Sequence, residues 1–149
     1  MKVYPHLWFE DQAEEAMTFY TSVFKDSKIL DRMQLPDRLA HFRFELGGTP
    51  FAALDTRTHR PFNEAISLYV ETEGQEETDY YWNALTADGG MERPCGWLTD
   101  KFGVYWQVIP NVLLRLLQDP DKVKAGRVLQ AMYEMKKIII ADLERAYRG

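Results

Sequence analysis

The order of segments in the first half of the chain is repeated in the second half. The letters H-L-W-F-E at residues 6–10, an acidic helix start and F-Y are echoed by S-L-Y-V-E at residues 67–71, an acidic start and Y-W. G-T-P-F-A-A-L from Gly48 is likewise matched by G-V-Y-W-Q-V-I from Gly103. A sheet with one helix on it keeps a second face bare, and two such units can bury their bare faces around a shared groove. We therefore expect an α+β fold of two βαβββ modules that form a curved sheet around a cleft, with C-terminal helices added.

In the first half of the chain, several segments alternate between apolar and polar residues, as half-buried strands do. Within residues 3–9, Pro5, Leu7 and Phe9 point one way, and Tyr4, His6 and Trp8 the other, which looks like the wall of a cavity. Residues 10–24 have the spacing of an amphipathic helix, with Asp11 as the expected N-cap. Residues 28–35, 39–46 and 50–55 read as strands, and Gly47-Gly48 predicts a hairpin turn between the last two.

The second half predicts a strand at residues 65–71, a helix at 75–87 and strands at 95–98 and 104–109. Residues 112–117, 122–135 and 142–148 read as helices. We expect a single domain, in which residues 1–110 form the paired modules and residues 111–149 a helical extension packed on them.

Composition narrows the class of protein. The 149 residues carry a net charge of -5, which argues against a nucleic-acid or an anionic-membrane partner. One cysteine cannot form an internal disulfide, and this fits a reducing compartment. No leader is evident, and the longest apolar run, residues 138–141, is far too short to cross a bilayer. These features predict a cytoplasmic protein.

The chain resembles the PhnB-like proteins of the vicinal-oxygen-chelate superfamily, which has the fold of glyoxalase and the bleomycin-resistance proteins. The likeness rests on P-H-L-W-F near the start, on F-Y late in the first helix and on C-G-W-L-T-D-K-F-G-V-Y-W-Q-V-I-P near residue 100. This subgroup is labelled as similar to 3-demethylubiquinone-9 3-methyltransferase. The resemblance implies the paired-module fold and a homodimer with a small-molecule cleft; it does not imply one chemistry. No Gly-rich turn follows a first parallel strand, as S-adenosylmethionine enzymes usually have.

The resemblance also implies where a metal would lie. In metal-using members, four ligands come from four strands, and these positions fall near His6, Ala52, Ser67 and Gln107. Ala52 has no donor and Ser67 is a poor one, so we predict no metal and no other cofactor. A divalent metal is the less favoured alternative, and it would need a bulge to re-aim Asp55 or Glu64.

Two residues are candidates for catalysis. His6 can act as a general base or as part of a metal site, since imidazole titrates near neutral pH. Its plainer role is a cavity-lining histidine bonded to a neighbour such as Gln107. Cys95 can act as a nucleophile or a redox-sensitive thiol, but a small buried side chain is the simpler reading, because no base is adjacent in sequence.

Strand alternation puts five aromatic residues on the face that is expected to line the cavity: Tyr4, Trp8, Tyr69, Trp97 and Tyr105. They either fill the groove or stack on a planar ligand. Arg43 and His41 could hold an anionic group of that ligand, although we favour a solvated or dimer-facing surface for them. The predicted ligand-binding set is His6, Trp8, Arg43, Ser67, Tyr69, Trp97, Tyr105 and Gln107.

Two functions follow. The first is a metal-free cleft protein that binds a small, planar aromatic molecule, with no turnover inferred. The second is a metal-dependent isomerase, lyase or dioxygenase of the superfamily type that uses His6. The missing ligands favour the first. The sequence identifies neither the ligand nor a reaction.

Overall fold

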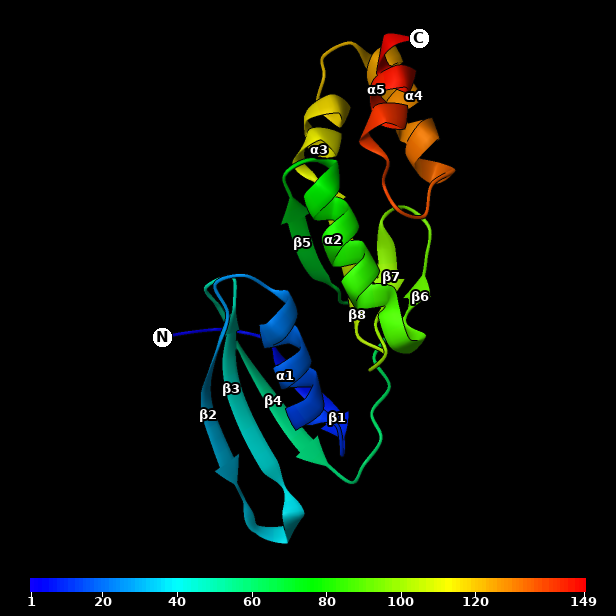
Figure 1. The fold of residues 1–149 in the computed structure, drawn as a ribbon. Coiled ribbons are helices and arrows are strands. Elements are labelled where there is room, and N and C mark those ends of the chain that lie inside the picture. The colour runs from blue at the N-terminus through cyan, green and yellow to red at the C-terminus, as the bar shows by residue number, and fades with distance from the viewer. The chain divides into compact units, whose positions relative to one another are not determined.

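The computed structural model describes residues 1–37 and 39–149 in full, together with the backbone of Arg38. The chain divides into two compact units, Met1–Pro61 and Phe62–Gly149 (Figure 1). Each unit has a four-stranded mixed sheet with a helix on one face, so the expected α+β class and the two βαβββ modules are confirmed. The cleft expected between the modules stays a prediction.

The first unit is a sheet with the strand order β1-β4-β3-β2, covered by one long helix (Figure 1). β1 runs parallel to β4, and the other neighbours are antiparallel. The β3–β4 hairpin turns at Gly47 and Gly48, as the sequence predicts, because both have the positive φ that this tight turn requires. The elements are β1 (His6–Glu10), α1 (Ala13–Val23), β2 (Lys28–Gln34), the short η1 (Pro36–Arg38), β3 (Ala40–Leu46) and β4 (Thr49–Thr56).

The alternation within β3 decides which face of this sheet is buried. Phe42 and Phe44 are buried under α1, while Arg43 between them is exposed. Phe44 stacks on Phe51 of β4 at 5.5 Å between ring centroids. α1 completes this core with its own buried side chains, Ala13, Ala16, Met17, Tyr20 and Val23.

The start of α1 differs from the prediction. The helix begins at Ala13, and its N-cap position is Gln12, whose side chain makes no capping bond. Asp11, the expected cap, lies outside the helix with φ 57. Instead, the Asp55 carboxylate on β4 accepts a hydrogen bond from the backbone N–H of Gln12 at 2.9 Å. An acceptor from a neighbouring strand therefore replaces the local cap, which sequence spacing alone does not reveal.

The second unit repeats this arrangement with the strand order β5-β8-β7-β6, in which β5 runs parallel to β8 (Figure 1). The sequence did not predict β6, which has only two residues and so carries no readable alternation. The elements are β5 (Leu68–Thr72), α2 (Gly74–Thr86), the short η2 (Ala87–Gly89), β6 (Met91–Glu92), β7 (Trp97–Thr99) and β8 (Tyr105–Pro110).

The C-terminal helices belong to the second compact unit: α3 (Asn111–Leu117), α4 (Lys122–Tyr133) and α5 (Ile140–Arg148). Their core contains Leu113, Val128, Ile138 and Leu143, and it reaches the sheet at Ile109. The boundary at residue 110 stays a prediction. Every helix of the described chain is too short or too polar to cross a membrane.

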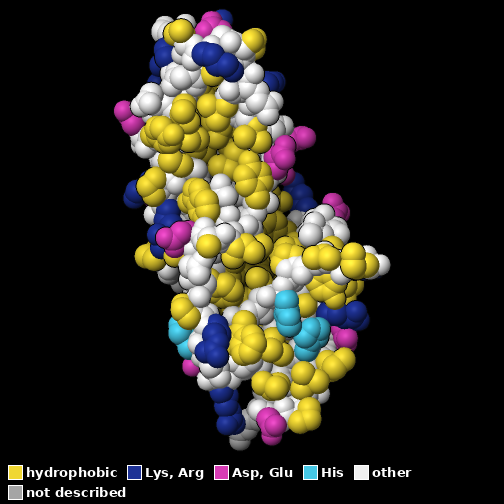
Figure 2. All heavy atoms as spheres, turned by 180° about the vertical axis from the view of Figure 1, so that it is seen from behind, with side chains coloured by type: hydrophobic (Ala, Val, Ile, Leu, Met, Phe, Trp, Pro, Cys, Tyr) yellow, Lys and Arg dark blue, Asp and Glu magenta, His cyan; other side chains and the backbone are white. Residues whose placement is uncertain are grey.

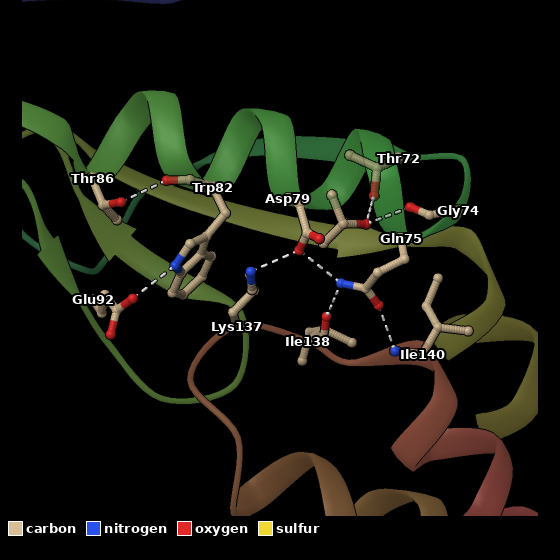
Figure 3. Close-up of polar contacts among 11 residues, drawn as sticks. Thr72, Gly74, Gln75, Asp79, Trp82, Thr86, Glu92, Lys137, Ile138 and Ile140 are labelled. Carbon is tan, nitrogen blue, oxygen red and sulfur yellow. Dashed lines mark hydrogen bonds and ion pairs between the residues drawn. The ribbon is translucent and has the colours of Figure 1, made fainter.

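The segment before α5 is fastened to α2 by side chains (Figure 3). Gln75 donates to the carbonyl oxygen of Ile138 at 3.1 Å and accepts from the amide of Ile140 at 2.8 Å. Lys137 forms an ion pair with Asp79 at 2.7 Å. Because one glutamine satisfies backbone groups on both sides of Ile139, it holds this irregular segment in place without regular secondary structure.

Candidate functional site

The face of the first sheet that α1 leaves bare carries polar and aromatic side chains. Figure 2 shows hydrophobic and histidine side chains exposed on the side of the molecule opposite the view of Figure 1. The register across β1, β4 and β3 makes two rows on this face, and their members are His6, Ala52 and Arg43 in one and Trp8, Leu54 and His41 in the other. The strand pairing is therefore consistent with the prediction that His6 and Trp8 share a face, and it adds Arg43 to that face.

His6 and His41 lie diagonally across β4. Their ring centroids are 5.4 Å apart and the rings meet edge to face. Ala52, which stands opposite His6, has only a methyl group, so no bulky side chain at that level of β4 separates them. Partial burial, and then the nearby His41, lower the pKa of His6 below its usual value. His6 is therefore neutral at pH 7 and can accept a hydrogen bond or a proton.

The indole ring of Trp8 is held by hydrogen bonds at its nitrogen. Its indole nitrogen donates to the Thr56 hydroxyl at 2.8 Å and to the carbonyl oxygen of Thr58 at 3.1 Å. The Arg60 guanidinium lies 5.8 Å from the ring centroid. These contacts fix the indole while leaving 39% of the residue exposed, so its apolar surface is available on this face.

Arg43 is less available for an anion than the sequence suggested. Its guanidinium is 3.5 Å from the Asp31 carboxylate on β2, and both side chains are partly exposed. The neighbouring pair of Lys28 and Glu45 is joined at 3.0 Å. The charges at this end of the face are thus paired with one another. This agrees with the interpretation that Arg43 lies on a solvated surface.

The bare face of the second sheet brings together most of the remaining predicted residues. The register places Gln107 of β8 between Tyr69 of β5 and Trp97 of β7. The Gln107 amide donates to the Ser67 hydroxyl at 2.8 Å. Burial, and then the nearby Glu71, raise the pKa of Tyr69, so its hydroxyl stays protonated at neutral pH. The amide of Gln107 is thereby oriented between two aromatic rings.

The turn between β7 and β8 explains the D-K-F-G-V-Y-W sequence. Asp100 is buried, and one carboxylate oxygen accepts from the amides of Phe102 and Val104 at 2.9 and 3.0 Å. Its other oxygen accepts from the indole nitrogen of Trp106 at 2.7 Å. Gly103 supplies the positive φ inside the turn. Asp100 therefore positions β8, with Tyr105 and Gln107 on its exposed side.

Sequence reasoning missed Arg93, which follows β6. Its guanidinium carbon lies 4.9 Å from the centroid of the Tyr105 ring, and its Nη2 donates to the Tyr105 hydroxyl at 3.4 Å. No local pattern marks it, because β6 is too short to show a face. Only the sheet register shows that this arginine stands on the same side as Trp97 and Tyr105.

Cys95 lies where the helical extension meets the sheet. It has φ 61, and its backbone amide donates to the carbonyl oxygen of Met135 at 2.8 Å, while the amide of Gly96 donates to the carbonyl oxygen of Lys136 at 2.7 Å. The residue is half-buried. These backbone contacts give the turn around Cys95 a structural role, and a chemical role for its thiol stays a prediction.

The residues at the metal-ligand positions do not fit a divalent cation. His6 pairs in register with Ala52, which has no donor, and the Ser67 hydroxyl is already bonded to Gln107. Asp55 accepts from the backbone at the start of α1, and burial raises its pKa despite these hydrogen bonds. Across residues 1–37 and 39–149, no group of three or more His, Cys, Asp or Glu could hold a metal ion.

Two modules, each with a helix on one face of a four-stranded mixed sheet, define the glyoxalase and bleomycin-resistance fold. A family model described as 3-demethylubiquinone-9 3-methyltransferase matches residues 1–109, and the chain belongs to this family. This confirms its likeness to the PhnB-like proteins of the vicinal-oxygen-chelate superfamily. No curated protein matches the chain.

Solved structures agree with this assignment. The PhnB protein from Bacillus cereus is 34% identical, with a TM-score of 0.65, and the match covers 74% of this chain and 99% of that one. Protein PA1353 from Pseudomonas aeruginosa is 20% identical, with a TM-score of 0.64 over 74% and 97% of the two chains. A mutant of the fosfomycin resistance protein FosX from Listeria monocytogenes, complexed with Mn(II) and 1S,2S-dihydroxypropylphosphonic acid, is 14% identical, with a TM-score of 0.60 over 78% and 97%. The last two likenesses concern the fold alone.

Proposed function

We propose that the chain binds a small, planar aromatic molecule on the bare faces of its sheets and needs no metal to do so. The observation that carries this proposal is the exposure of large aromatic side chains there: Trp8 is 39% and Tyr69 is 47% exposed. Aromatic surface left open beside oriented polar groups is typical of ligand sites. Ser67, Trp97, Tyr105 and Gln107 complete the set on the second sheet, and His6 and Arg43 on the first.

The polar groups support binding with a defined orientation. Neutral His6 can accept a hydrogen bond, and the Gln107 amide, fixed by Ser67, presents its carbonyl oxygen as an acceptor. We further propose that the chain forms a homodimer, since exposed apolar sheet faces of this kind also favour self-association. We also propose a cytoplasmic location, because a chain with a single cysteine cannot form an internal disulfide and fits a reducing compartment.

Binding can be tested with 2-naphthamide, a neutral planar probe, by titration of the protein's tryptophan fluorescence. We expect saturable quenching that is weakened at least about fivefold in Tyr69→Ala, because stacking on one aromatic ring contributes on the order of 1 kcal/mol. Tyr80→Ala is the matched control, since Tyr80 is 48% exposed but stands on helix α2. Equal loss in both variants, or no saturable binding by the wild type, would overturn the proposal.

The second candidate is a metal-dependent enzyme that uses His6. The observation that favours it is the adjacent pair of imidazoles, His6 and His41, on a fold that FosX shares. Its test is the metal content of the untagged protein, purified without chelator, by elemental mass spectrometry. Near-stoichiometric metal that is lost in His6→Ala would support the enzyme, and a trace amount that is unchanged in His6→Ala would contradict it.

A further inference from the structure

Arg93 stands on the bare face of the second sheet and has no acidic partner among the described residues. The residue is half-buried, and its Nε is closed from solvent without a hydrogen-bond partner in the described part of the chain. Among the described residues, its side chain makes one cation–π contact, to the Tyr105 ring at 4.9 Å, and one hydrogen bond, to the Tyr105 hydroxyl at 3.4 Å. A guanidinium that is partly withdrawn from water is stabilised by an anion, and an aromatic ring takes the place of that anion only in part.

Thr99, on the neighbouring strand β7, is a second polar residue whose side chain has no hydrogen-bond partner in the described part of the chain. Thr99 is 4% exposed, and its hydroxyl oxygen makes no hydrogen bond to any described residue. The register pairs Thr99 with Tyr105, and the Arg93 amide donates to the carbonyl oxygen of Trp97 at 2.8 Å. To reach Tyr105 on β8, the Arg93 side chain therefore crosses β7 between Trp97 and Thr99.

The side chains of Arg93, Thr99 and Tyr105 can all donate hydrogen bonds to a ligand. A guanidinium only donates hydrogen bonds, and it has five N–H groups, of which one is used here. The Tyr105 oxygen accepts from Arg93, so its own proton remains to be donated. The Thr99 hydroxyl can donate as well. Donors of this kind on one face, with no acidic group paired to the arginine among the described residues, are suited to an oxyanion.

We propose that Arg93, Thr99 and Tyr105 form a subsite for the oxyanion of the ligand, a carboxylate or phosphate group carried on its aromatic ring. The proposal rests on the proposed function and names the charged group of that ligand. Because Nε is closed from solvent, the guanidinium turns outward from β7 as the anion binds, and the stack on Tyr105 gives way to charge-assisted hydrogen bonds. The subsite lies within the second unit.

The test compares 2-naphthoate and 2-naphthyl phosphate with neutral 2-naphthamide by fluorescence titration. We expect at least one anion to bind about tenfold or more tightly than the amide, as charge-assisted hydrogen bonds allow. The preferred anion identifies the group that the subsite takes. Arg93→Gln should bring the preference to within about threefold, and Arg93→Lys should keep part of it. Arg115→Gln, which removes an exposed charge on α3 of the same unit, should leave it unchanged.

A direct readout follows the Arg93 Nε–H resonance, which should shift as the preferred anion is added and stay in place with 2-naphthamide. If the amide binds and neither anion binds more tightly, the subsite is refuted while the aromatic site stands. If an anion binds through Arg93 and the amide does not bind at all, the subsite stands and the aromatic site is refuted. If the Nε–H resonance does not move and the anions bind no more tightly than 2-naphthamide, then Arg93 Nε and the Thr99 hydroxyl hold only a buried water. That result also refutes the subsite.

Discussion

Replacement of Asp100 should show how the turn before β8 is held. In Asp100→Ala, the amides of Phe102 and Val104 and the indole nitrogen of Trp106 lose their acceptor. Phe102 lies near solvent and can bond to water, whereas Val104 and Trp106 are 3% and 2% exposed. Two buried donors thus lose the acceptor that Asp100 gives them in the wild-type protein.

The magnitude follows from those two donors. A buried donor left unsatisfied costs about 1–3 kcal/mol, so the free energy of unfolding should fall by about 4 kcal/mol. For a chain of this length this corresponds to a fall in Tm of about 12 °C. In Asp100→Asn the amide oxygen still accepts from the turn, but the amide NH2 cannot accept from Trp106, so we expect about half the loss.

Guanidinium unfolding followed by tryptophan fluorescence measures these losses. The double variant Asp100→Asn with Trp106→Phe removes both members of the carboxylate–indole bond, and it should be more stable than the sum of the single losses predicts by about 1 kcal/mol or more. Asp88→Asn, at an exposed aspartate of the same unit, should change stability by less than about 0.5 kcal/mol. Stability of Asp100→Ala equal to that of Asp88→Asn would refute the reasoning.

Three further outcomes are expected. NMR titration should give His6 a pKa below 6.5, and His41→Gln should raise it only in part, because burial is the larger cause; a complete return to 6.5 would contradict this. The Lys137 contact lowers the pKa of Asp79, so the ion pair stabilises the fold above the unfolded value of 3.8 and is lost as the pH falls through the lower folded value. Asp79→Asn should therefore cost under about 1 kcal/mol at pH 7, since the pair is partly exposed, and nothing at low pH; an equal cost at both would argue against it. Gly96→Ala should lower the unfolding free energy by more than about 1 kcal/mol, because φ is +79 and the new methyl would lie 2.5 Å from an isoleucine carbon; an unchanged value would disprove the contact.

The helix assignment illustrates what local pattern can and cannot predict. The spacing of apolar residues correctly predicted α1 and its buried side, since each turn of a helix repeats the same face. It failed at the first residue of the helix, because the acceptor for Gln12 comes from Asp55, 43 positions along the chain. A local rule that selects Asp11 as the cap has no access to that contact.

The candidate site divides in the same way. Strand alternation placed Trp8, Tyr69, Tyr105 and Gln107 on bare faces, because the parity of a strand depends only on the order of its residues. It did not find Arg93, whose strand is two residues long. The stack on Tyr105 becomes visible only when β6, β7 and β8 are in register.

The sequence by itself determined the repeated module, the βαβββ order of the first unit, the hairpin at Gly47-Gly48 and the chemical character of each sheet face. These features depend on periodicity and on single-residue backbone preferences, which are local. Tertiary structure alone decided that His6 meets His41, that Asp100 joins the turn to Trp106, and that Arg93 lies over Tyr105 without an acidic partner among the described residues. Such contacts depend on which strands pair and in which register, and that is set by the packing of the whole unit.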